Sequence, residues 1–199
     1  MPFDYTNWAP LTPQEAVEQF REFASDWCIA GGWGLDLFME KQTRQHGDID
    51  ILIFRKDQGK VQSLLADHEL FVVDPPGQLR PWLPGETLAP PLYNIWVRAH
   101  ADAPWSIQLM IQDTEGEEWV FRRDHTIRGA LSKMIVYSSA AWPILSPEIQ
   151  LLYKGKSIGA KDQADFNHLL PYLSTPQKEW LREKLKTAYG NFHHWVAGL

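Results

Sequence analysis

The sequence predicts an α/β (α+β) fold, in which helices flank a small mixed β-sheet and a helical part completes the C-terminus. Helix-start signals recur along the chain, short apolar runs typical of buried strands lie between them, and after Pro143 only helical patterns remain. The chain has 199 residues, the size of one domain or of one small domain with a helical appendage. We therefore expect two parts, residues 1–143 and 144–199.

Three helix starts share one signature, a hydroxyl residue followed by proline, as in Thr12-Pro13, Ser146-Pro147 and Thr175-Pro176. Glu15 follows Thr12 by three residues, which predicts a capping box at the first start. Helical spacing of apolar residues predicts helices over the ranges 13–25, 33–39, 57–68, 147–158, 161–172 and 177–188.

Strands are expected where apolar residues alternate with polar ones or run together. These ranges are 27–30, 48–54, 69–73, 93–99, 105–112 and 118–123. Prolines between Pro75 and Pro91 exclude continuous regular structure from about residue 74 to 92. A connection of this length predicts a functional loop over a pocket.

Composition limits the partners and the location of the protein. Acidic residues number 25 and basic residues 19, so no broad cationic surface is expected for nucleic acid. The single cysteine, Cys28, excludes an intrachain disulfide and is typical of a reducing compartment. No apolar stretch approaches the roughly 20 residues of a membrane helix, and no signal-peptide pattern is present. We expect a cytoplasmic protein with no nucleic-acid or membrane partner; the oligomeric state is left open.

The strongest functional pattern joins Gly31-Gly32, at a strand-to-helix turn, to Asp48-Ile49-Asp50 on the next strand. Two glycines let the backbone approach a ligand, and a helix N-terminus offers N–H groups to a phosphate. Asp48 and Asp50 leave one face of a strand, where two carboxylates favour a bound cation such as Mg²⁺. Each part alone has an ordinary explanation, a turn or a solvated strand edge. Together they predict a site for a nucleoside triphosphate with Mg²⁺.

Several segments resemble the nucleotidyltransferases of the aminoglycoside 2''-adenylyltransferase type: CIAGGWGLDLF, TRQHGDIDILIF, WVFRRD, LSPEIQLLYKGK and KDQADFNHLLPYL. This group is a branch of the polymerase-beta-like superfamily that includes the lincosamide nucleotidyltransferases. The resemblance runs from about residue 12 to 195. It implies a mixed sheet bearing the active site and a helical C-terminal part completing the pocket. The implied reaction moves a nucleoside monophosphate from a Mg²⁺-bound triphosphate to a hydroxyl of a small molecule, such as an aminoglycoside or lincosamide antibiotic.

The resemblance also implies roles for individual residues. Asp48 and Asp50 match the metal-binding pair. The nucleotide-binding positions are Gly31, Gly32, Arg44, His46 and Lys154. Arg44 and Lys154 would balance the charge of the triphosphate, although a solvated helix face also explains Lys154. His46 would donate a hydrogen bond to a phosphate or hold the turn.

One position departs from the family pattern. The superfamily uses a third carboxylate on a neighbouring strand, and the matching position in 105–112 holds Gln108. An amide accepts no proton at neutral pH, so general-base catalysis worth roughly 10²- to 10⁴-fold would be missing. An acid such as Asp113 or Glu115 could substitute, the alignment of this strand could differ, or metal activation and positioning could suffice. The alternative is a catalytically degenerate protein that binds nucleotide or ligand without turnover, or an interaction module that has abandoned the site.

The acceptor is constrained only by charge and aromatic content. Excess negative charge favours a cationic acceptor. Acidic side chains that could attract it lie in one turn, at Asp113, Glu115, Glu117 and Glu118. Tryptophans that could stack on a ring are Trp82, Trp96, Trp105 and Trp119. Solvation of a hairpin also explains the acidic residues and is the favoured explanation, and packing in a core also explains the tryptophans.

Overall fold

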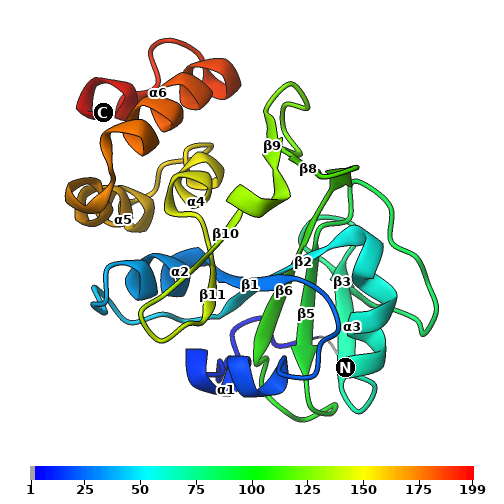
Figure 1. Cartoon of the computed structure of the whole chain (residues 1–199). Coiled ribbons are helices and arrows are strands. Elements are labelled where there is room, and N and C mark those ends of the chain that lie inside the picture. The colour runs from blue at the N-terminus through cyan, green and yellow to red at the C-terminus, as the bar shows by residue number, and fades with distance from the viewer. Residues whose placement is uncertain (1–2) are drawn as a thin grey trace. The chain divides into compact units, whose positions relative to one another are not determined.

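The structure is a computed structural model that describes residues 3–199. The chain divides into two compact units, each built from two stretches of sequence (Figure 1). The first unit contains Met1–Ile29 and His46–Thr114, and the second contains Ala30–Gln45 and Glu115–Leu199. Helices and a mixed sheet confirm the predicted α/β class. The boundary near residue 143 stays a prediction.

The first unit is built on a mixed sheet. Its strands are β1 (Trp27–Ala30), β2 (Asp50–Phe54), β3 (Glu69–Val73), β4 (Leu79–Pro81), β5 (Asn94–Arg98) and β6 (Ile107–Gln112). They lie in the order β1-β2-β6-β5-β3-β4. β2 and β6 are parallel, whereas β5 is antiparallel to both β6 and β3. Two helices, α1 (Pro13–Gln19) and α3 (Gln58–Leu64), and a short 3-10 helix, η1 (Arg55–Asp57), belong to the same unit.

The two faces of this sheet differ in character. One face is apolar and fully buried at Ile51, Ile53, Ile95, Val97, Ile107 and Leu109. The opposite face carries half-buried side chains at Asp50, Asn94, Trp96, Gln108 and Met110. Burial of each aliphatic side chain contributes about 1.5–3 kcal/mol, and a slip of one residue would turn them all to the other face. The apolar face therefore sets the register that positions the polar one.

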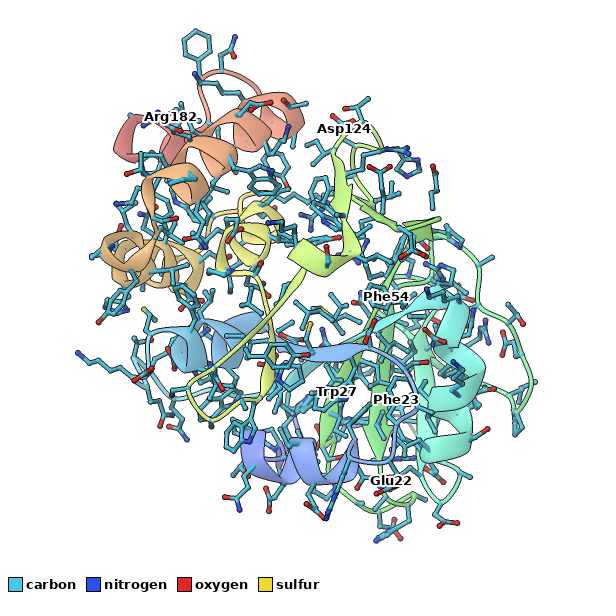
Figure 2. The ribbon with its side chains drawn as sticks, in the orientation of Figure 1. Glu22, Phe23, Trp27, Phe54, Asp124 and Arg182 are labelled. Atoms are coloured by element: carbon cyan, nitrogen blue, oxygen red, sulfur yellow. The ribbon has the colours of Figure 1, made fainter. Side chains whose placement is uncertain are left out.

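The first helix begins as predicted. The Thr12 hydroxyl accepts a hydrogen bond from the Glu15 backbone N–H at 3.2 Å, and the Glu15 carboxylate accepts one from the Thr12 N–H at 2.8 Å. The helix ends at Gln19 rather than near residue 25. Beyond it Phe20 packs against Trp27 with ring centroids 4.9 Å apart; Figure 2 labels Trp27 at the start of β1. The apolar residues after Gln19, which the sequence analysis assigned to the helix, instead lie in turns where their aromatic rings pack together.

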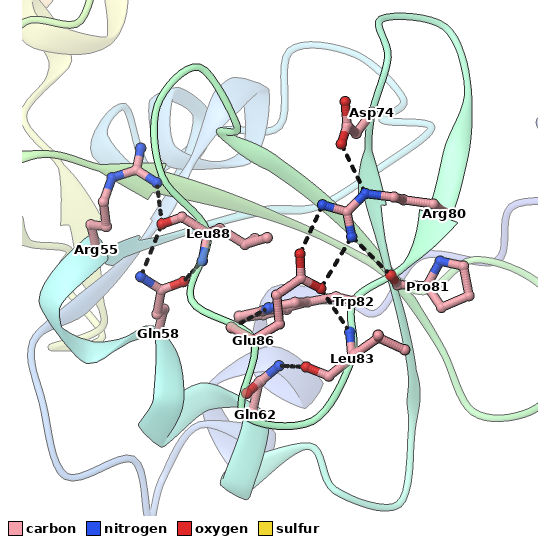
Figure 3. A network of polar contacts seen from close by, with 10 residues as sticks. All are labelled: Arg55, Gln58, Gln62, Asp74, Arg80, Pro81, Trp82, Leu83, Glu86 and Leu88. Carbon is pink, nitrogen blue, oxygen red and sulfur yellow. Dashed lines mark hydrogen bonds and ion pairs between the residues drawn. The ribbon is translucent and has the colours of Figure 1, made fainter.

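The proline-rich segment has little regular structure, as predicted, apart from β4. Side chains of the preceding helices hold it instead of a strand ladder. Gln58 bonds both the N–H and the C=O of Leu88, at 2.7 and 3.2 Å, and Arg55 donates to the carbonyl of Leu92 at 3.0 Å. Figure 3 shows Gln58 and Arg55 at Leu88, together with further contacts of the segment made by Gln62, Asp74, Arg80 and Glu86. Trp82 and neighbouring residues of the segment line a cavity of about 350 Å³ in this unit.

The second unit is mainly helical. Its helices are α2 (Gly31–Phe38), α4 (Pro147–Lys154), α5 (Ala160–Leu169) and α6 (Thr175–Tyr189), with the 3-10 helices η2 (Leu131–Lys133), η3 (Leu170–Tyr172) and η4 (His194–Gly198). Its strands are short: β8 (Glu118–Val120), β9 (Arg128–Ala130), β10 (Ile135–Tyr137) and β11 (Pro143–Leu145), while β7 (Thr114–Glu115) lies where the chain enters the unit. β8 pairs with β9 and β10 with β11, both antiparallel. Asp124, labelled in Figure 2, accepts hydrogen bonds from Thr126 in the turn between β8 and β9.

Two helix starts in this unit refine the predicted signature. α6 begins at Thr175, two residues before the predicted range 177–188, because Ser174 rather than Thr175 is the N-cap and forms the capping box with Gln177. Ser146 precedes α4 as predicted, but its hydroxyl donates to the Lys133 carbonyl at 2.8 Å rather than capping the helix. None of the helices in residues 3–199 has the length and apolar character that a membrane crossing requires.

Candidate functional site

The glycine turn lies where the sequence predicts it, directly after β1. Gly31 is the first residue of α2 and has a φ of +64°, a conformation that side chains bearing a Cβ disfavour. Its N–H donates to Oε1 of Gln150 at 2.7 Å. Gln150 belongs to α4 and is only 5% exposed. The Gly31 amide is therefore engaged within the second unit, and any phosphate contact by this turn falls to the amides that follow it.

The two aspartates lie at the start of β2, in the first unit. Asp50 is the first residue of the strand and is half-buried, whereas Asp48 precedes the strand and is exposed. Ile49 between them is fully buried, and its carbonyl accepts a hydrogen bond from the Gln108 N–H at 2.9 Å. The predicted alternation thus extends to residue 48, although the strand itself begins two residues later than expected.

Gln108 stands directly opposite Asp50. The two residues are paired across the parallel strands β2 and β6, and Trp96 of β5 is paired with Gln108 on its other side. Paired residues share a face of a sheet, so Asp50, Gln108 and Trp96 form one row on the half-buried face. The amide therefore occupies the neighbouring-strand position where the family pattern leads one to expect an acid.

The donor atoms of Asp48, Asp50 and Gln108 fit Mg²⁺. Two carboxylates and an amide carbonyl are hard oxygen ligands, and Mg²⁺ is commonly held by one or two carboxylates, with water and substrate phosphates completing its shell. Within residues 3–199 no group of three or more His, Cys, Asp or Glu side chains could hold a metal ion by itself. A cation bound at Asp48 and Asp50 would thus depend on its nucleotide for further ligands.

Arg44 and Lys154, both in the second unit, are brought together by Asp165. Arg44 donates to the two carboxylate oxygens of Asp165 at 3.0 and 3.2 Å, and the Lys154 ammonium lies 2.9 Å from Oδ2. Lys154 also lies 3.0 Å from the carboxylate of Asp162. Burial would raise the pKa of Asp165, but hydrogen bonds and charges from Arg44 and Lys154 outweigh it and hold the pKa below its usual value. Both predicted phosphate-binding cations therefore belong to one ion-pair cluster.

The other candidate residues from the sequence are either buried or held in ion pairs. His46, two residues before Asp48, is 7% exposed in the first unit. Asp113, considered above as a substitute acid, pairs with the guanidinium of Arg55. Glu115 and Glu118 both pair with Arg128, at 2.8 and 3.5 Å.

The four tryptophans considered above pack into the protein. Trp82, Trp105 and Trp119 are 4%, 2% and 1% exposed. Trp96 packs in a cluster of aromatic side chains that includes Trp105. Their packing favours the structural explanation over ring stacking with a ligand.

Sequence reasoning missed two site-supporting residues, Gln150 and Asp165. Gln150 is a polar side chain inside the apolar run from Ile149 to Leu152, and such a residue needs a partner when buried. Asp162 and Asp165 are three apart on α5, a spacing that places both on one helix face. The sequence thus indicated that both side chains need partners. It did not indicate which ones, because Gly31 lies 119 residues from Gln150 and Arg44 lies 121 residues from Asp165.

The mixed sheet, the glycine turn after β1 and the aspartate pair at β2 define a protein with the nucleotidyltransferase fold. Residues 14–75 match the family model of aminoglycoside-2''-adenylyltransferase. That range includes the glycine turn and both aspartates. No curated protein sequence matches the chain.

Solved structures share the fold over most of the chain. The lincomycin-bound crystal structure of the lincosamide antibiotic adenylyltransferase LnuA has a TM-score of 0.58 and 19% identity, and the likeness covers 83% of this chain and 100% of that one. The crystal structure of ANT(2")-Ia in complex with adenylyl-2"-tobramycin has a TM-score of 0.56 and 14% identity, covering 88% and 95%. The predicted resemblance to this branch is confirmed by the family match over residues 14–75, and the solved structures show the same fold.

Proposed function

We propose that this protein is a Mg²⁺-dependent nucleotidyltransferase that moves a nucleoside monophosphate from a nucleoside triphosphate to a hydroxyl of a small antibiotic. The observation that carries the proposal is the family match over residues 14–75, because it spans both the glycine turn and the aspartate pair. LnuA has been solved with lincomycin and ANT(2")-Ia with an adenylylated tobramycin. Lincosamides and aminoglycosides are accordingly the acceptors to test first.

In this proposal Asp48 and Asp50 hold the metal. Bound Mg²⁺ would neutralise phosphate charge and make the phosphorus a better electrophile. Gln108, paired with Asp50, offers a carbonyl oxygen to the metal shell or an amide N–H to the substrate. Neither atom accepts a proton at neutral pH, so Gln108 would help to position the acceptor hydroxyl, and the proton released when the new O–P bond forms would pass to solvent as pyrophosphate leaves.

Arg44, Lys154 and the first turn of α2 supply positive potential for the triphosphate. The N-terminus of α2 has no side-chain cap, so its amides after Gly31 are available to an anion. Asp165 holds Arg44 and Lys154 in place and also neutralises part of their charge. His46 remains a proposed partner of the phosphates or of the turn that precedes Asp48.

The test combines purified protein, Mg²⁺, ATP or GTP, and a panel of aminoglycosides and lincosamides. Expected results are pyrophosphate release and an acceptor whose mass increases by one nucleoside monophosphate. Asp50→Asn should reduce turnover by at least about 10²-fold, as expected when a metal ligand is lost. Absence of pyrophosphate and of product with every acceptor, together with no nucleotide binding by calorimetry, would overturn the proposal.

A second function is favoured by one observation, the amide of Gln108 opposite Asp50. A degenerate member of the fold would bind nucleotide with Mg²⁺ and not turn it over. Calorimetric binding without product defines this outcome. Recovery of turnover in Gln108→Asp would then show that only the proton acceptor is missing.

A further inference from the structure

The cavity of about 350 Å³ in the first unit lies beside the proline-rich segment, where the sequence predicts a pocket. None of the residues assigned to nucleotide or metal lines it. We propose that this cavity binds a small phenol, a neutral apolar ring that carries one hydroxyl. Such binding needs neither nucleotide nor Mg²⁺, so the inference stands apart from the proposed function.

Side-chain contacts hold the wall that the segment contributes. Gln62 of α3 donates to the Leu83 carbonyl at 2.9 Å (Figure 3) and accepts from the Gly85 N–H at 3.0 Å. The Glu86 carboxylate accepts from the Leu83 N–H at 3.1 Å and pairs with Arg80 at 2.8 Å. Small-ligand sites are usually preformed and span about 300–1,000 Å³. A held wall and a volume near the lower end of that range suit a single ring.

The accessible part of the wall is mainly apolar. Its exposed or half-buried side chains are Ala66, Leu70, Pro81, Leu83 and Pro84. Leu83 alone is 60% exposed. Proline rings pack well against flat aromatic rings, as they do when proline-rich segments are recognised by aromatic-lined grooves. Two prolines in the wall therefore favour an aromatic ring as the apolar part of the ligand.

His68 is the side chain of this wall that has hydrogen-bonding capacity to spare. Glu69 is paired with Arg98 at 2.8 Å, and the Trp82 indole N–H donates to the Glu86 carbonyl at 2.8 Å. The His68 imidazole, in contrast, forms no hydrogen bond with any residue from 3 to 199, and its Nδ1 is buried. A ligand in the cavity would therefore reach the imidazole at Nε2.

The chemistry of the imidazole selects a neutral hydroxyl. A neutral imidazole has one nitrogen that donates and one that accepts. A phenolic hydroxyl can do either, so it satisfies Nε2 in both tautomers. A carboxylate on the ligand would lie close to Glu69, and an ammonium group would find Glu69 already paired with Arg98. The wall therefore disfavours charged ligands of either sign.

The experiment compares phenol with toluene, in which a methyl group replaces the hydroxyl. The backbone amide resonances of Ala66 and Leu83, which line the cavity, are followed by NMR without nucleotide or Mg²⁺. Phenol should shift them saturably and bind at least about threefold more tightly than toluene, the scale expected for one hydrogen bond. Equal or tighter binding of toluene, or no saturable shift with phenol, would overturn the proposal.

Variants test the assigned hydrogen bond. In His68→Phe toluene should bind more tightly than phenol, because the hydroxyl would be buried without a partner. His100→Phe, the same change at an exposed site of the first unit outside the cavity, should preserve the preference for phenol. Leu83→Ala should weaken both probes by about two- to fivefold, because part of the apolar wall is lost. A retained preference for phenol in His68→Phe, or unchanged affinities in Leu83→Ala, would contradict the assignment.

Discussion

Asp165 binds Arg44 through both of its carboxylate oxygens, at 3.0 and 3.2 Å, and it is only 3% exposed. The same carboxylate reaches Lys154 at 2.9 Å. Two cations that the sequence pointed to separately are therefore held by one buried anion, which links α5 to α4 and to the segment that follows α2.

Removing that anion should destabilise the second unit. Asp165→Asn leaves two partly buried cations without full compensation, and we expect a loss of about 2–4 kcal/mol in the free energy of unfolding, measured in urea. Asp162→Asn is the matched control. The Asp162 side chain is 27% exposed and, among residues 3–199, forms its ion pair with Lys154 alone, so the expected loss is below about 1 kcal/mol. Equal losses would contradict the assigned role of Asp165.

The same carboxylate predicts a pH dependence. The folded-state pKa of Asp165 lies below the ordinary value of 3.8, so the unfolded chain binds the proton more readily and stability rises with pH through this range. The contribution is fully present above about pH 4 and is lost as the pH falls through the folded-state pKa. Unfolding temperatures of wild type and Asp165→Asn should therefore differ at pH 6 and converge towards about pH 2. A difference that grows with acidity would refute this.

The two glycines of the turn should respond oppositely to alanine. Gly31 has a φ of +64°, so Gly31→Ala should cost about 1–2 kcal/mol of stability. Gly32 does not have a positive φ and lies within α2. The higher helix propensity of alanine should therefore leave the free energy of unfolding of Gly32→Ala unchanged or raise it by up to about 1 kcal/mol. Chemical denaturation of both variants checks the sign, and a similar loss in each would disprove the conformational argument.

Gln150 should be required to hold the Gly31 amide. Gln150→Leu preserves approximate volume but leaves that N–H unpaired in a buried position, which should cost about 1–3 kcal/mol. Amide hydrogen exchange at Gly31 should also accelerate. Gln163→Leu, which removes a hydrogen bond to the Trp195 indole at 2.9 Å in the same unit, is the control that should leave exchange at Gly31 unaffected.

A carboxylate introduced opposite Asp50 should make stability depend on magnesium. In Gln108→Asp, two like charges would be directly paired across β2 and β6, which should destabilise the protein by about 0.5–1 kcal/mol without metal. Mg²⁺ should raise the unfolding temperature of this variant more than that of wild type. Gln78→Asp, at an exposed position, should show no such gain. An identical Mg²⁺ response in wild type and Gln108→Asp would argue against a metal at this row.

The sequence predicted those features of the fold that depend on interactions between residues close together in the chain. The Thr12 capping box, the glycine turn before α2 and the alternation in β6 all follow from neighbouring residues. Strands of three residues, such as β9 and β11, are too short to display a period. The end of α1 was misjudged because aromatic spacing at Phe20 and Trp27 serves turn packing.

The site was predictable in its motifs but not in its supporting contacts. Asp48, Asp50 and Gln108 could be placed because strand alternation fixes which side chains share a face. Gln150 and Asp165 act on residues more than a hundred positions away, and a single sequence carries no local signal for such pairings. Their identity as partners emerges only from the fold.

The interleaving of the two units has a consequence for any attempt to dissect the protein. The chain passes from one unit to the other after Ile29, after Gln45 and after Thr114. Cutting one peptide bond therefore cannot release either unit as a continuous fragment. A deletion of the chain beyond residue 114 would leave residues 30–45 without the rest of their unit. A chimera between two proteins of this fold would have to exchange both stretches of the second unit, Ala30–Gln45 and Glu115–Leu199, together. Recombination at a single crossover exchanges only one of them and is therefore expected to yield insoluble products.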